Sequence, residues 1–227
     1  LLNLFCSPDL RIDWIKAFIE GIQETCRTYC ISIVGGDIST LPTGQFTAAL
    51  SLTGHLEGPP LLRDGAQAGD AIYVTGTLGG SIYRKHHSFE PRLAEGQWLA
   101  RSNDCSAMMD ITDGLAKDLK ALIPRGCAAL VDLASLPLAS DAHRRSRESG
   151  QSAQTHAFCD GEDYELLFTV KGTTNLRQFE ARWFEQFSTL RISKIGEICE
   201  NETEALYLDS QTREPLPSLN AFEHLSE

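Results

Sequence analysis

The stretch Asp110-Ile-Thr-Asp113-Gly114-Leu115 decides how this sequence is interpreted, because it sets two carboxylates three positions apart where a predicted strand gives way to a predicted helix. Carboxylates at such a junction can hold a divalent metal beside a phosphate chain. Aspartate is also a favoured N-cap, and Asp113 directly precedes the predicted helix. A cap does not need a second carboxylate on the preceding strand, so both readings stay open, one of them being metal-assisted phosphoryl chemistry.

Composition limits the classes of partner. The chain has 227 residues, of which 42% are hydrophobic and 22% charged, as in an ordinary globular protein of one large or two small domains. With 31 acidic against 20 basic residues, its formal net charge of -11 argues against a nucleic acid or an anionic membrane as the main partner. The sequence has no apolar run near the roughly 20 residues of a membrane-spanning helix. We therefore expect a cytoplasmic protein.

Cysteine usage adds no special site. The seven cysteines form no Cys-x-x-Cys pair, so neither a disulfide framework nor a zinc knuckle is indicated. The sequence also lacks a Gly-x-Ser-x-Gly elbow, an HExxH motif and a P-loop. Acidic clusters beside glycine turns remain, and they favour metal-dependent nucleotide chemistry outside the P-loop fold.

Apolar periodicity predicts alternating helices and strands. Apolar positions three and four apart predict a helix over 13–29, and β-branched or alternating runs predict strands over 31–34 and 46–56. The turn-forming residues 57–60 are the expected domain boundary. Beyond it, strands are expected at 71–75, 106–110, 128–132, 164–170, 191–198 and 205–208, and helices at 90–101, 114–123, 141–148 and 175–187. The predicted fold class is α/β (α+β), with a mixed sheet possible.

Three further segments carry candidate chemistry. Gly35-Gly36-Asp37 follows a predicted strand, where ligand sites in open sheets lie, although a plain tight turn is the alternative. The cluster Asp160-Gly-Glu-Asp-Tyr-Glu165 abuts a predicted buried strand, with a solvated acidic turn as its alternative. Arg63 precedes a Gly-rich turn and is the best-placed guanidinium for a phosphate, unless it is simply a surface arginine.

Taken together and in this order, four motifs resemble the thiamine-monophosphate kinases, members of the aminoimidazole ribonucleotide synthetase superfamily. They are Ile33-Val-Gly-Gly-Asp37, the segment from Leu62-Arg63 to Thr77, Asp110 to Leu115, and Gly161-Glu-Asp-Tyr-Glu-Leu-Leu-Phe-Thr169. The resemblance runs from about residue 8 to residue 225. It implies an enzyme that uses ATP and Mg²⁺ to phosphorylate the existing phosphate of thiamine monophosphate, giving thiamine diphosphate.

The resemblance also implies roles for individual residues. It gives no catalytic residue separate from the metal and ATP ligands. The implied metal ligands are Asp37, Asp110 and Asp113, the ATP contacts are Gly36, Arg63 and Thr112, and the contacts to the thiamine moiety are Glu162 and Phe222.

The family's N-terminal Gly-Asp-Asp motif has no counterpart in these residues. We therefore expect 1–57 to be a remnant of an N-terminal ATP and dimerisation domain, and 58–227 to be a C-terminal domain of the synthetase-like type. The full-length protein is expected to be a homodimer, and the isolated chain to be inactive or weakly active. The alternatives are another ATP-using enzyme of the superfamily, such as selenophosphate synthetase or the hydrogenase maturation factor, or a non-catalytic nucleotide-binding module.

Overall fold

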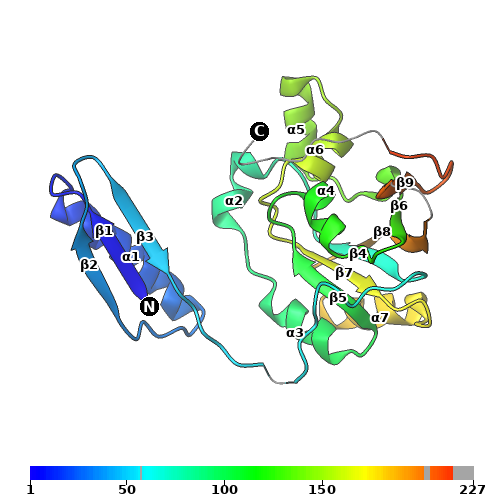
Figure 1. Ribbon diagram of the computed structural model, residues 1–227, viewed down its shortest axis with the longest axis horizontal. Coiled ribbons are helices and arrows are strands. Elements are labelled where there is room, and N and C mark those ends of the chain that lie inside the picture. Colours follow the sequence, from blue (N-terminus) through cyan, green and yellow to red (C-terminus); the bar gives the residue numbers. More distant parts are fainter. Residues whose placement is uncertain (57, 202–204, 217–227) are drawn as a thin grey trace. The chain divides into compact units, whose positions relative to one another are not determined.

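The structure is a computed structural model and describes residues 1–56, 58–201 and 205–216. Its chain divides into two compact units, Leu1–Glu57 and Gly58–Glu227 (Figure 1). Each unit combines a sheet with helices, which confirms the predicted mixed class. A search of the described residues finds no helix with the length and apolarity needed to cross a membrane.

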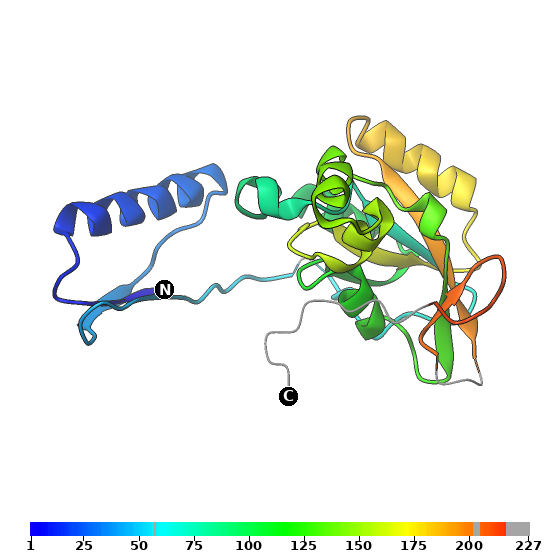
Figure 2. The same ribbon diagram turned by 90° about the horizontal axis from the view of Figure 1, so that it is seen from above.

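The first unit is a three-stranded sheet with one long helix. Its elements are β1 (Leu2–Cys6), α1 (Ile12–Thr28), β2 (Gly36–Thr40) and β3 (Phe46–Leu50). The strand order is β2-β1-β3, with β2 parallel and β3 antiparallel to β1. Because β1 and β2 are parallel, the chain needs a crossover between them, and α1 supplies it. Figure 2 shows α1 lying over one face of this sheet.

The core of this unit combines alternate residues of β1 with one face of α1. Every second residue of β1 points inward, as expected for a pleated strand. The helix contributes a stripe of residues spaced by three and four positions. The core consists of Leu2, Leu4 and Cys6 with Leu10, Ile15, Phe18, Ile19, Ile22 and Phe46. The helix predicted over 13–29 is therefore confirmed within one residue at each end.

The strand predicted over 31–34 is wrong. The parallel register pairs Leu2 of β1 with Gly36, so the strand begins two residues after the predicted one ends. Residues 31–34 precede that register and form no strand in the structure. Gly36 is required there, because a Cβ would lie 1.9 Å from the Leu2 carbonyl oxygen. Asp37 accordingly stands near the start of a strand and not just after one.

The second unit is built on a six-stranded sheet of order β5-β7-β4-β8-β6-β9. All neighbouring pairs are antiparallel except the parallel pair β6 and β9. The strands are β4 (Ala71–Thr75), β5 (Cys105–Asp110), β6 (Cys127–Val131), β7 (Leu166–Val170), β8 (Ile192–Glu200) and β9 (Tyr207–Asp209). The helices are α2 (Lys85–Ser88), α3 (Leu93–Arg101), α4 (Leu115–Asp118), α5 (Ser140–Ser149), α6 (Ala153–Cys159) and α7 (Leu176–Gln186), with 3-10 turns at Ser81–Tyr83, Leu119–Ala121 and Leu133–Ser135.

Both faces of this sheet are covered, and β4 shows how. Its residues Ile72 and Val74 enter one core, which also contains residues of α4 and α6. Ala71 and Tyr73 enter the other, beside residues of α3 and α7. A strand buried on both faces is apolar throughout, which is why the run 71–75 was readable as a buried strand. Figure 1 shows α4, α5 and α6 on one side of the sheet and α3 and α7 on the other.

The helix predicted over 114–123 is shorter than expected. In the structure α4 has four residues and passes directly into the 3-10 turn Leu119–Ala121. The helix expected over 90–101 begins at Leu93, and α6 was not predicted at all. The strand expected over 46–56 ends at Leu50.

Candidate functional site

Two acidic loops form one continuous surface at the end of strands β5 and β7. The antiparallel register pairs Asp110 with Leu166, and the pairing continues beyond both strands. The Ile111 amide donates to the Glu165 carbonyl at 2.8 Å, and the Tyr164 amide donates to the Ile111 carbonyl at 2.9 Å. The Glu162 amide donates to the Thr112 carbonyl at 2.7 Å. The motif at 110–115 and the cluster at 160–165, distant in sequence, are therefore side by side.

Two glycines permit this close approach. Gly161 has φ +77° and Gly114 has φ +107°, both in the region that favours glycine. A Cβ on Gly161 would lie 2.8 Å from the Thr112 carbonyl oxygen, and one on Gly114 would lie 2.8 Å from the Cys159 carbonyl oxygen. Any larger residue would push the two loops apart.

A buried carboxylate, Asp118, shapes the loop that carries the aspartates. Its Oδ2 accepts the Thr112 amide at 2.8 Å and the Asp113 amide at 3.0 Å. Burial raises the pKa of Asp118, and the two N–H donors oppose that rise. Sequence reasoning did not single out Asp118. The available signal was a charged residue three positions after Leu115, on the apolar face of the predicted helix.

The side chains of this loop offer oxygen ligands. Asp110 and Thr112 are exposed, and the Thr112 hydroxyl donates to Asp110 Oδ2 at 2.8 Å. Asp113 is half-buried and forms an ion pair with Lys117 at 2.7 Å. It does not cap the helix, since Gly114 holds the N-cap position. The alternative reading of Asp113 as an N-cap is therefore wrong.

These groups fit part of a magnesium shell. Within the described ranges, no group of three or more His, Cys, Asp and Glu side chains is arranged to hold a metal ion. Mg²⁺ in phosphoryl-transfer sites commonly takes one or two carboxylates, with waters and substrate phosphates completing its octahedron. The oxygens of Asp110, Asp113 and Thr112 suit this habit. Their role as metal and ATP ligands stays a prediction.

The acidic cluster divides into outward and inward side chains. Glu162 is exposed and has φ +55°, and Tyr164 is half-exposed with φ +50°. Asp163 and Glu165, which alternate with them, are buried. The bland interpretation of a solvated acidic turn is therefore wrong for Asp163 and Glu165.

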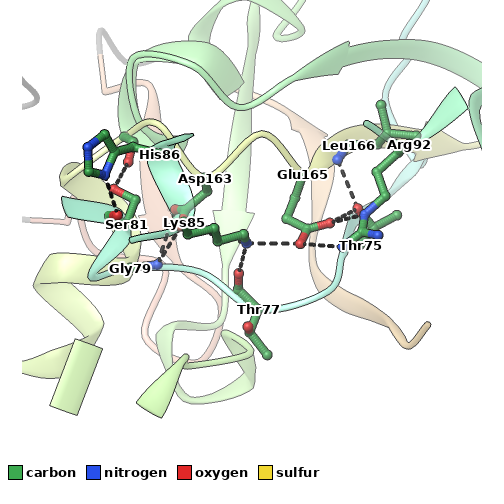
Figure 3. A network of polar contacts seen from close by, with 11 residues as sticks. Thr75, Thr77, Gly79, Ser81, Lys85, His86, Arg92, Asp163, Glu165 and Leu166 are labelled. Carbon is green, nitrogen blue, oxygen red and sulfur yellow. Dashed lines mark hydrogen bonds and ion pairs between the residues drawn. The ribbon is translucent and has the colours of Figure 1, made fainter. Parts of the chain in front are cut away.

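Glu165 is the centre of a buried polar network (Figure 3). Its carboxylate accepts from Arg92 Nε at 2.8 Å and Nη2 at 2.9 Å, from Lys85 Nζ at 2.9 Å and from the Thr75 hydroxyl at 2.7 Å. Burial by itself raises the pKa of Glu165. The hydrogen bonds and charges of Arg92 and Lys85 with the Thr75 hydroxyl outweigh burial, so that the pKa lies below its ordinary value. The network keeps Glu165 ionised and fixes it under the loop.

Asp163 lies on the other side of Lys85 (Figure 3). Both its carboxylate oxygens accept the Gly79 amide, at 3.0 and 3.1 Å, and Lys85 Nζ is 3.9 Å away. Burial raises the pKa of Asp163 to about 7, although Lys85 and the Gly79 amide pull it down. The hydroxyl of Ser81 donates to the Gly161 carbonyl at 2.6 Å and completes the anchoring of the loop.

The remaining predicted site residues lie outside these two loops. Arg63 is exposed, on a segment beside β5 where the Leu62 carbonyl accepts the Met108 amide at 3.2 Å. Gly36 and Asp37 belong to the first unit, and the Asp37 carboxylate accepts the Ser39 hydroxyl at 2.9 Å. Phe222 lies outside the described residues.

Comparison with known proteins finds several thiamine-monophosphate kinases. Residues 1–56 match the family model described as AIR synthase related protein, N-terminal domain. The thiamine-monophosphate kinase of Rhodopirellula baltica is 38% identical over 152 residues, which are 66% of this chain and 48% of that protein. The thiamine-monophosphate kinase of Aquifex aeolicus is 30% identical over 234 residues, which are 95% of this chain and 71% of that protein.

A solved structure shows the same fold. The structure described as AaThiL complexed with AMPPCP and TMP superposes with a TM-score of 0.67 at 24% identity, over 94% of this chain and 70% of that one. The chain spans about half the length of the first curated relatives that it matches, namely 48% and 55% of two of them.

Proposed function

The chain belongs to the thiamine-monophosphate kinase family, and from this premise we propose that it carries part of a Mg²⁺-dependent site for phosphorylating thiamine monophosphate with ATP. One observation carries the proposal. The loop with Asp110, Thr112 and Asp113 is hydrogen-bonded to the loop with Glu162, so groups suited to a metal-nucleotide complex and to a cationic substrate share one surface. The solved neighbour is a complex with AMPPCP and TMP, which supports this choice of ligands.

The chemistry asks little of the protein beyond binding and orientation. The attacking atom is a phosphate oxygen that is already anionic, so the reaction needs no strong general base. Asp110 and Asp113 would hold Mg²⁺, which neutralises charge on the phosphates when it is bound. For Asp37 as a metal ligand, and for Gly36 and Arg63 as contacts to ATP, the proposal rests on the family resemblance of their motifs alone.

The chain's own residues orient the reactants. The Thr112 hydroxyl donates to the Asp110 carboxylate, and Asp118 holds the backbone amides of Thr112 and Asp113. Glu162, exposed beside this loop, offers a negative charge to the thiazolium cation of thiamine. Correct orientation converts a bimolecular transfer into an effectively intramolecular one, and together with charge neutralisation it supplies the acceleration in such reactions.

Calorimetry with the purified chain separates the two halves of this assignment. We expect Asp110→Asn to weaken binding of ATP with Mg²⁺ at least tenfold, a loss of about 1.4 kcal/mol. Glu162→Gln should weaken thiamine monophosphate and leave ATP unchanged. Glu197→Gln on β8, a half-exposed carboxylate outside both loops, is the matched control for both. If Glu162→Gln leaves thiamine monophosphate binding untouched, the substrate assignment is wrong. Formation of thiamine diphosphate from ATP, Mg²⁺ and thiamine monophosphate tests the transfer itself.

A further inference from the structure

We infer that Phe89 and Tyr164 form a stacking platform for a planar cationic heteroaromatic ring, which in the proposed reaction is the thiazolium ring of thiamine monophosphate. The inference rests on the proposed function and names residues that the family resemblance did not. The two rings are stacked, with centroids 4.1 Å apart and planes inclined by 25°. Neither ring belongs to a hydrophobic core among the described residues, and Phe89 is 36% exposed.

The buried network of Figure 3 joins the two segments that carry the rings. Lys85 and Arg92 lie on either side of Phe89 in the sequence, while Asp163 and Glu165 lie on either side of Tyr164. The cations of one segment bind the carboxylates of the other, at 2.8 to 3.9 Å. Ion pairs therefore hold together the two segments that carry the rings, while Phe89 is exposed and Tyr164 half-exposed.

The backbone holds Tyr164 at the surface at a local cost. Its φ of +50° is unusual for a bulky residue, and such strain persists only where surrounding contacts impose it. Here the Tyr164 amide is held by the Ile111 carbonyl, within the ladder that joins the two acidic loops. The strained backbone of Tyr164 thus keeps its aromatic ring out of the core, on the loop that is hydrogen-bonded to the loop of Asp110.

Charge around the platform selects a cation. Glu162 lies two residues from Tyr164, and Asp110 precedes Ile111, whose carbonyl accepts the Tyr164 amide at 2.9 Å. Burial raises the pKa of Tyr164, and both carboxylates raise it further. A cation over an aromatic face is attracted by the ring quadrupole, and adjacent carboxylates add to that attraction. A neutral adenine ring would gain only the stacking. The thiazolium ring is the part of the two proposed substrates that combines a flat aromatic ring with a fixed positive charge.

The test compares thiamine monophosphate with its neutral analogue, in which a thiophene ring replaces the thiazolium. Equilibrium dialysis would measure both ligands, and ATP with Mg²⁺, against the intact chain and its variants. We expect Phe89→Leu and Tyr164→Leu each to weaken thiamine monophosphate about tenfold and the neutral analogue clearly less. Tyr164→Phe keeps the ring and should stay within about twofold. Phe184→Leu, an exposed aromatic on α7, is the matched control. Thermal unfolding of every variant shows whether it is folded.

The inference is overturned when the unmodified chain does not bind thiamine monophosphate, or when folded Phe89→Leu binds thiamine monophosphate unchanged. An equal loss of affinity for the charged and the neutral ligand overturns it too. Weaker ATP binding in Phe89→Leu, with thiamine monophosphate binding unaffected, also overturns the inference and indicates that the platform binds adenine. Failure of the kinase proposal is distinguishable, since transfer is measured separately. Platform-dependent binding without thiamine diphosphate formation retains the platform whatever the outcome for the kinase proposal. An unchanged KM for thiamine monophosphate in a Phe89→Leu variant that still forms thiamine diphosphate supports the kinase and rejects the platform.

Discussion

Replacement of Glu165 by glutamine should be the most destabilising isosteric change in the second unit. The Glu165 side chain is 2% exposed, and its partners Lys85 and Arg92 are 26% and 17% exposed. Glutamine keeps the volume and one acceptor oxygen, but its NH₂ group meets a cationic donor. Arg92 then loses its carboxylate partner, and Lys85 keeps only the Asp163 carboxylate at 3.9 Å.

The magnitude follows from that loss. Removing one partner of a buried ion pair costs about 3–5 kcal/mol. Because Lys85 and Arg92 retain some contact with water, we expect Glu165→Gln to fall at the lower end, about 3 kcal/mol. With a urea m-value of about 1–3 kcal/mol/M, the unfolding midpoint should fall by about 1–3 M.

Urea titration followed by tryptophan fluorescence measures the effect, since Trp98 and Trp183 both lie in this unit. The control is Glu197→Gln, whose carboxylate and its partner Lys194 are 47% and 42% exposed and 3.9 Å apart. That change should cost about 0–1 kcal/mol. Because the pKa of Glu165 is lowered in the folded state, its stabilisation is present above the unfolded pKa of about 4.3 and is lost below it. The gap between the chain and Glu165→Gln should therefore close in acid. A loss below about 1 kcal/mol at pH 7 would refute the role given to the network.

Three further predictions concern the loops and their supports. In urea titration, Gly161→Ala should lower the free energy of unfolding by at least about 1 kcal/mol more than Gly150→Ala. Both glycines have φ +77°, but only at Gly161 would the Cβ meet backbone atoms. Equal losses in the two variants would contradict the close approach of the two loops. Asp118→Ala should lower the free energy of unfolding by about 1–3 kcal/mol and weaken binding of ATP with Mg²⁺ in calorimetry, since the part-buried amides of Thr112 and Asp113 lose their acceptor. Unchanged nucleotide binding would show that Asp118 does not support the site. The pKa of Asp163 is about 7 in the folded chain, so folded Asp163 keeps a proton that the unfolded chain loses near pH 4. The free energy of unfolding should therefore fall as the pH rises from about 4 to about 7, and Asp163→Asn should abolish that fall in thermal unfolding scans. A pH profile that Asp163→Asn does not alter would refute this prediction.

The sequence predicted what is set locally. The spacing of Ile15, Phe18, Ile19 and Ile22 determines α1, because one face of a helix is enough to define it. The run 71–75 is apolar throughout because both faces of β4 are covered. The strand at 31–34 failed because strand limits depend on the register with β1, which no local pattern contains.

The site was predictable as residues but not as an arrangement. The motifs at 110–115 and 160–165 were each visible, whereas their adjacency depends on the β5 and β7 pairing and on two glycines with positive φ. The shortened helix after Gly114 has a tertiary cause as well, since Asp118 turns back to bind the Thr112 and Asp113 amides. A single sequence does not show that Phe89 and Tyr164 contact each other. In the fold, ion pairs between their sequence neighbours join the two segments that carry them.

The alternation within the acidic cluster gives a way to separate stability from binding. Asp163 and Glu165 are buried and bind cations and an amide (Figure 3), whereas Glu162 is exposed and Tyr164 half-exposed. If the inward pair is the support and the outward pair the binding surface, a change at Glu162 should leave the urea midpoint unchanged and alter ligand affinity. A change at Glu165 should alter the midpoint first, and affinity only because the platform shifts. Measuring both quantities in both variants therefore distinguishes this division of labour from a uniformly structural loop, in which stability and binding would fall together.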